Sequence, residues 1–235
     1  MKLEHAVFLA ATGATVAGAV TGNERLQQVA KPLMAPALAA RVWRRRDEVD
    51  RADAGLLLAA LAAATVGDVF MIDPDDDARL VRGASSFAVM QTGYSTLLAR
   101  HGARPTAPAL VPRLLGWLGA AGLLRARART VSTTLTGYGA VLATTSTLSA
   151  DPALAPGARV VAGTALPNAD RRSWLALGGL LFTGSDALIV VRRLFVRGET
   201  GRRVTEGVVL ASYGAAQVLL VEGMLALGAS RRRES

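Results

Sequence analysis

Two aspartates, Asp68 and Asp186, stand inside otherwise apolar segments of the chain. Even on the most lenient insertion scale, an ionisable side chain costs about 2.5–3.5 kcal/mol at the centre of a bilayer. A membrane chain with two such groups at similar places in two segments is expected to use them. Two carboxyl groups can divide acid–base work, because an apolar site keeps one protonated while a nearby cation keeps the other ionised. Lys31 is the candidate cation.

The elements that carry these residues are predicted to be membrane helices. Hydrophobic residues make up 51% of the 235 positions, and the mean hydropathy is +0.33. The segments 52–72, 173–191 and 206–228 are apolar around most of their circumference, and each is long enough to cross about 30 Å of hydrocarbon. We therefore predict an all-α fold, a polytopic membrane bundle in one domain, residues 1–235.

The hydropathy pattern predicts about eight transmembrane helices. Lys31 and Pro32 suit the first turn of the second helix, because the N–H that proline lacks is not needed there. The segment 150–172 is compatible either with a half-helix at 158–166 or with a plain loop. The predicted spans are 4–21, 29–43, 53–72, 81–99, 108–124, 131–149, 173–195 and 205–228.

The third and seventh predicted spans run in the same direction, because both are odd-numbered. Asp68 and Asp186 lie at similar distances from the starts of these spans, so both are expected in the same half of the bilayer. The second span opens on that face, which brings Lys31 toward them. Basic residues are spread almost evenly over the two sides. We expect both termini in the cytoplasm, since the acidic run 73–77 would then lie outside.

Several functions are excluded by composition. The net charge is +9, but the arginines form short clusters between apolar segments, as interfacial anchors do, so we expect membrane lipids and no nucleic acid as partners. Cysteine is absent and the two histidines lie at segment edges, so neither a metal site nor a cofactor is expected. The acidic run 73–77 lacks the spacing of a calcium loop and is predicted to be a solvated turn. Ser185 is in no G-x-S-x-G motif and has no histidine partner, which excludes a serine hydrolase.

Five short motifs, in order, resemble the YhhN family over roughly residues 25–225. They are Lys31-Pro-Leu-Met, Gly67-Asp68-Val-Phe-Met, Gly83-x3-Phe87-x6-Tyr94, Gly179-x2-Phe182-x2-Ser185-Asp186 and Tyr213-x3-Gln217. The animal members of this family are lysoplasmalogenases. The resemblance implies an eight-span enzyme that hydrolyses the vinyl ether bond of a lysophospholipid to a fatty aldehyde and a glycerophospho-base.

The resemblance also implies site residues. Asp68 and Asp186 fall on the two aspartates that are the leading catalytic candidates of the family. The predicted substrate-binding residues are Lys31, Gln91, Tyr94, Ser185, Tyr213 and Gln217. Gln91 is a departure, because many relatives carry histidine there. The long segment 150–172 also differs from the common pattern, and both differences leave the exact substrate open.

Each of these residues also has a structural interpretation. Asp68 can cap the turn into the acidic run, Asp186 and Gln217 can hydrogen-bond between helices, and Lys31 can snorkel to the interface. Tyr94, Tyr138 and Tyr213 more often pack or form an interfacial belt.

Two other functions stay open beside the vinyl ether hydrolase. One is a non-catalytic lipid-binding or transport protein, and the other is a hydrolase of another lysolipid. The excess of arginine over lysine favours a GC-rich bacterial genome, so we expect the cell membrane of a bacterium. The oligomeric state cannot be predicted.

Overall fold

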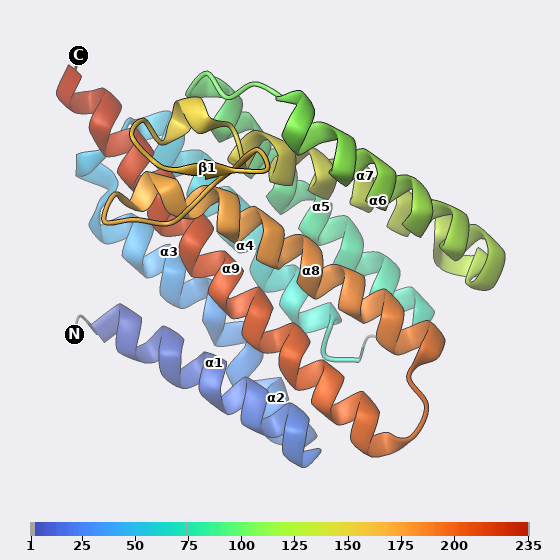
Figure 1. Cartoon of the computed structure of the whole chain (residues 1–235). Coiled ribbons are helices and arrows are strands. Elements are labelled where there is room, and N and C mark those ends of the chain that lie inside the picture. Colours follow the sequence, from blue (N-terminus) through green and yellow to red (C-terminus); the bar gives the residue numbers. More distant parts are fainter. Residues whose placement is uncertain (1–2, 74, 235) are drawn as a thin grey trace.

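The computed structural model describes residues 3–73 and 75–234, and it is a bundle of long helices (Figure 1). The residues 1–2, 74 and 235 of the predicted domain, one of them inside the acidic run, lie outside the described part. Among the described residues, five helices are long and apolar enough to cross a membrane. They are α1 (Leu3–Thr21), α4 (Arg51–Phe70), α6 (Ala107–Arg127), α8 (Trp174–Phe195) and α9 (Glu199–Glu234). The predicted all-α membrane bundle is confirmed.

Three further helices fill the remaining predicted segments. They are α3 (Met34–Arg44), α5 (Asp77–Arg100) and α7 (Arg129–Ser149). Helices α5 and α7 have 24 and 21 residues, enough to span a bilayer, but neither contains a stretch as apolar as those in the five helices above. Each predicted segment thus contains a helix, while the number of membrane crossings stays a prediction.

The second predicted span is not one continuous helix. A short helix, α2 (Glu24–Ala30), starts at the cap Asn23, whose Oδ1 accepts a hydrogen bond from the backbone N–H of Leu26 at 3.1 Å. A 3₁₀ turn, Lys31–Leu33, then separates α2 from α3. Pro32 explains the break, because proline lacks the N–H that a continuous helix needs. Lys31, predicted in the first turn of a helix, therefore lies in the turn that connects α2 to α3.

The segment 150–172 contains a small β-hairpin, so it is neither the half-helix at 158–166 nor a plain loop. Strand β1 (Val160–Val161) pairs antiparallel with β2 (Thr164–Ala165). The turn between them has positive φ at Ala162 (48°) and Gly163 (73°), as a two-residue hairpin turn of type I′ requires. A Cβ at Gly163 would lie 2.6 Å from the Cβ of Pro108, so glycine lets the hairpin pack directly on the start of α6.

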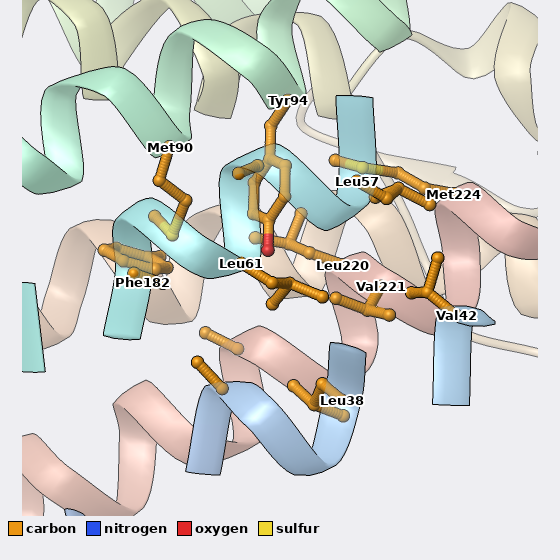
Figure 2. Close-up of a cluster of buried hydrophobic side chains, with 14 of the residues drawn as sticks. Leu38, Val42, Leu57, Leu61, Met90, Tyr94, Phe182, Leu220, Val221 and Met224 are labelled. Carbon is orange, nitrogen blue, oxygen red and sulfur yellow. The ribbon is translucent and has the colours of Figure 1, made fainter. Parts of the chain in front are cut away.

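The core lies where α3, α4, α5, α8 and α9 meet. Figure 2 shows leucine, valine and methionine side chains from these helices gathered around Tyr94, whose hydroxyl points into the cluster. Helix α9 lies beside α8 through the middle of the bundle (Figure 1). Its 36 residues correspond to about 54 Å of helix, more than one hydrocarbon thickness. The start of α1 and the end of α9 lie at the same end of the bundle.

Helices α6 and α7 form one edge of the bundle and pack on each other (Figure 1). The outer face of α6 exposes large apolar side chains, among them Leu115 (63% exposed) and Leu118 (51%). Exposing an apolar face of this size to water costs free energy, and this cost is removed when lipid chains cover the face. The outer face of α6 is therefore expected to contact lipid.

Candidate functional site

The first group of predicted site residues surrounds Asp68, near the end of α4. Asp68 is fully buried, and its Oδ2 accepts a hydrogen bond of 3.0 Å from the hydroxyl of Tyr213 on α9. That hydroxyl accepts a bond of 3.1 Å from Nε2 of Gln217, whose Oε1 accepts one of 2.9 Å from the hydroxyl of Tyr94 on α5. Four predicted site residues thus form one hydrogen-bonded chain across three helices.

Lys31 belongs to the same group. It is 5% exposed, and its Nζ donates a hydrogen bond of 2.6 Å to the backbone oxygen of Met71, just after α4. Asp68 and Glu206 are the carboxylates that act on it electrostatically. The ammonium group of Lys31 is thus buried at the end of α4, and its part in a site stays a prediction.

Asp186 has different partners. It lies on α8, is half-buried, and its Oδ2 accepts a short hydrogen bond from the hydroxyl of Tyr138 on α7. Within the described residues, Tyr138 is the hydrogen-bonded partner of Asp186, and Lys31 is placed with Asp68 instead. The expectation that one site holds both aspartates and the lysine is therefore only half met. Sequence reasoning weighed Tyr138 only as a packing or belt residue, and its bond to Asp186 depends on packing across the bundle.

Gln91 lies on α5 and is fully buried. Neither atom of its side-chain amide has a hydrogen-bond partner of good geometry among the described residues, yet the amide is close enough to act on the phenol of Tyr138. A buried amide without partners costs about 1–3 kcal/mol, so it commonly marks a place where something else binds. Gln91 thus joins Tyr138 and Asp186 in a second group.

A cavity of about 460 Å³ lies between α5, α6, α7 and α8, and Asp186 and Tyr138 are in its wall. Most lining residues are apolar, and the charged ones are Asp186, Arg113 and Arg193. The volume and the apolar wall are those of a site for a lipid chain or a similar small molecule. Arg113 was missed as a site residue, although an arginine inside a predicted span is a functional signal by itself.

The ring of Phe87 lies between the two groups. It lines the cavity and makes edge-to-face contacts with Phe182 (6.3 Å between centroids) and Tyr213 (5.8 Å). On its other side it lies against Gly67, where a Cβ would come within 2.9 Å of the ring. Glycine beside Asp68 is therefore required for the ring to pack there. Asp68 itself is not in the cavity wall.

Ser185 has a structural contact. It is buried, and its Oγ donates a hydrogen bond of 3.0 Å to the backbone oxygen of Val209. This bond joins α8 to α9 immediately beside Asp186. Ser185 is not in the cavity wall, so it supports the position of Asp186 and has no contact with the cavity space.

The acidic run is not simply a solvated turn. Arginines of the α8–α9 end hold it, because Asp75 pairs with Arg192 (3.1 Å) and with Arg202, and Asp77 pairs with Arg193. Partial burial raises the pKa of Asp75, but the bond from Arg202 and the charge of Arg192 outweigh it and lower the pKa below its ordinary value. Among the described residues, no cluster of His, Asp and Glu is arranged to hold a metal ion.

Replacing Tyr213 with phenylalanine is expected to destabilise the protein by about 1–3 kcal/mol. The substitution leaves Oδ2 of Asp68 without its hydrogen bond, and Oδ1 already has no partner among the described residues. Thermal unfolding in a fixed detergent measures the loss. Tyr94→Phe is the matched control, because it removes only a neutral bond to Gln217 and should cost less. Equal losses would show that Tyr213 does not stabilise Asp68.

Comparison with known proteins agrees with the motifs. The chain matches the model of the YhhN family over residues 26–224, which covers most of its length. No curated protein and no solved structure matches it. Both aspartates, the cavity and the hydrogen-bonded chain around Asp68 lie inside the matched region. The chain belongs to the YhhN family of membrane proteins.

Proposed function

We propose that this protein is a membrane-embedded hydrolase that cleaves the vinyl ether bond of lysoplasmalogen-type lysophospholipids. The observation that carries the proposal is the place of Asp186. Its carboxyl group lies in the wall of a largely apolar cavity, and a phenol rather than a cation binds it. We propose the cell membrane of a bacterium as its location, with both termini in the cytoplasm.

A vinyl ether is cleaved by acid. Asp186 gives its proton to the β-carbon of the double bond, which leaves an oxocarbenium ion at the α-carbon. Water adds to the α-carbon, and its proton returns to the Asp186 carboxylate. The hemiacetal then collapses, the proton moves to the glycerol oxygen, and a fatty aldehyde and a glycerophospho-base leave. This sequence needs neither a nucleophilic side chain nor a metal.

An apolar surrounding favours the neutral form of a carboxyl group, which is the form that donates the proton. The bond from Tyr138 fixes the orientation of the Asp186 carboxyl and leaves Oδ1 for the substrate. The amide of Gln91 acts on that phenol from outside the cavity wall, so its proposed part is to position Tyr138.

Asp68 has a supporting part in the proposal. It lies behind Phe87, next to Lys31, outside the cavity wall. A buried carboxylate stabilises positive charge nearby far more than it does in water, because the surrounding dielectric constant is low. Asp68 is therefore proposed to stabilise the oxocarbenium ion electrostatically, with Lys31 and Tyr213 keeping the carboxylate in place.

The cavity also supports a second candidate function. An apolar space of this size binds a single lipid chain whether or not a reaction follows. A lipid-binding or transport protein, or a hydrolase of another lysolipid, would use the same space.

The experiment that separates these functions is an aldehyde assay on purified protein in detergent. The substrates are a lysoplasmalogen and an acyl lysophospholipid with the same head group and chain length. The proposal predicts fatty aldehyde from the lysoplasmalogen and no fatty acid from the acyl lipid. Fatty acid release would favour the other hydrolase. No product from either lipid, with a folded sample, would favour the binding or transport protein.

A further inference from the structure

Arg113 is a buried cation without an anionic partner in the described part of the chain. It lies on α6 and is 9% exposed. Its Nε donates a hydrogen bond of 2.8 Å to Oγ of Ser146, and its Nη1 donates one of 2.8 Å to the backbone oxygen of Ala109. Nη2 has no hydrogen-bond partner there. Both occupied acceptors are neutral, so the positive charge is not balanced.

A buried, unbalanced guanidinium is costly, and proteins that keep one commonly use it to bind an anion. Arg113 lines the same cavity as Asp186. Arg193, the other arginine in the wall, already pairs with Asp77. Arg113 is therefore the cationic residue of the cavity wall that can pair with an anionic ligand. Its planar guanidinium group suits phosphate oxygens.

The spacing along the cavity fits one class of ligand. Arg113 bonds to Ser146 on α7, and Ser146 packs on Gly179 of α8, where a Cβ would lie 3.1 Å from the Cα of Ser146. Asp186 follows Gly179 by seven residues, which is about 10 Å along the helix. In a lysoplasmalogen, seven bonds separate the phosphorus from the β-carbon of the vinyl ether, or about 8 Å in an extended chain.

We propose that Arg113 binds the phosphate group of a single-chain phospholipid, whose first chain carbons then lie beside Asp186. The proposal rests on the proposed function for the position of the reacting bond, but binding itself requires no hydrolysis. The remaining chain continues along the apolar wall toward Leu194, away from Arg113.

The cavity contains its own reporter. Trp117 is in the cavity wall, and its Nε1 donates a hydrogen bond of 2.9 Å to the backbone oxygen of Thr136. The other tryptophans of the chain, Trp43 and Trp174, are not in this wall. In a background with Trp43→Phe and Trp174→Phe, the fluorescence comes from Trp117, and quenching reports a brominated chain next to this residue.

The test is quenching of Trp117 by an uncleavable 1-O-alkyl lysophosphatidylcholine with a brominated chain. The comparison ligand is the same brominated alkylglycerol without phosphocholine. The lysolipid is expected to bind about tenfold more tightly, and Arg113→Gln is expected to abolish this preference without changing the affinity for the alkylglycerol. Arg113→Lys should retain part of the preference.

Equal effects of Arg113→Gln on both ligands, or no effect on either, would overturn the proposal. Inorganic phosphate separates the two sources of the anion. If phosphate at the same concentration as the lysolipid abolishes the preference, Arg113 selects the free anion and the lipid proposal is overturned. Because the probe cannot be cleaved, this test stands even if the aldehyde assay finds no enzyme.

Discussion

Replacing Asp186 with asparagine is expected to reduce aldehyde release from lysoplasmalogen by about 10²–10⁴-fold, the usual contribution of a positioned general acid. The amide of asparagine keeps the size of the side chain and can still bind the Tyr138 hydroxyl, but it has no proton to give to a carbon atom. The change should therefore lower kcat and leave KM nearly unchanged. Steady-state rates at several lipid concentrations measure both.

The matched control is Ser185→Ala, the neighbouring buried position. Ser185 bonds to α9 and does not line the cavity, so its loss should change stability slightly and kcat little. The kcat of Tyr138→Phe is expected to lie between those of Asp186→Asn and Ser185→Ala. In this variant the acid remains, but the phenol no longer orients it. Full activity in Asp186→Asn would exclude this residue as the acid and leave Asp68 as the alternative. Equal losses in Asp186→Asn and Ser185→Ala would mean that packing, and not acid catalysis, is affected.

The helices could be predicted because the sequence alone shows hydrophobic runs that are long enough to cross a bilayer. The two aspartates could be found for a related reason, since a charge inside such a run is rare and costly. Both inferences use only the neighbours of a residue in sequence. Pro32 also carried a local signal, because proline interrupts a helix. It was interpreted as the start of the second predicted helix, but α2 already begins at the capping residue Asn23.

The partners of the two aspartates could not be predicted in the same way. Asp68 meets Tyr213 and Asp186 meets Tyr138 because of how each helix is rotated about its axis, which depends on packing across the bundle. Lys31 bonds to the backbone oxygen of Met71, an acceptor that every residue possesses and no pattern reveals. Equal depth of the two aspartates in the membrane stays a prediction, and depth alone does not decide which residues face each other.

The hairpin at 160–165 was hidden for a different reason. Each strand has two residues, too few to show the alternation that identifies a strand. Its turn is Ala162-Gly163 instead of the usual Asn-Gly or Asp-Gly, and alanine at a positive φ is unusual.

A buried ionic network lies at the end of the bundle that carries both termini. Glu222 of α9 is 3% exposed, and it contacts Nε of Arg41 at 2.8 Å, Nη1 of Arg171 at 2.7 Å and Nη1 of Arg45 at 3.5 Å. His5 of α1 lies 3.5 Å from the same carboxylate. One carboxylate thus joins α1, α3 and the segment before α8 to α9.

Glu222→Gln is expected to destabilise the protein by at most about 3–5 kcal/mol, because the buried Arg41 loses its nearest carboxylate and keeps only the longer contact of 3.6 Å with Glu4. In a chain of this length, such a loss lowers the midpoint of thermal unfolding by about 10 °C. The cavity and Asp186 lie on other surfaces of the bundle, so activity at low temperature should persist. Unfolding followed by circular dichroism in a fixed detergent measures the effect.

Glu199→Gln is the matched control for this substitution. Glu199 is at the start of the same helix and pairs with Arg203 one turn later, but its side chain is 77% exposed, so its removal should cost less than about 1 kcal/mol. A second substitution, Arg41→Met, in the Glu222→Gln protein should recover part of the loss, because it removes the buried charge that has lost its nearest partner. If Glu222→Gln and Glu199→Gln unfold at the same temperature, solvent or lipid head groups compensate the arginines, and the network does not hold this end of the bundle together.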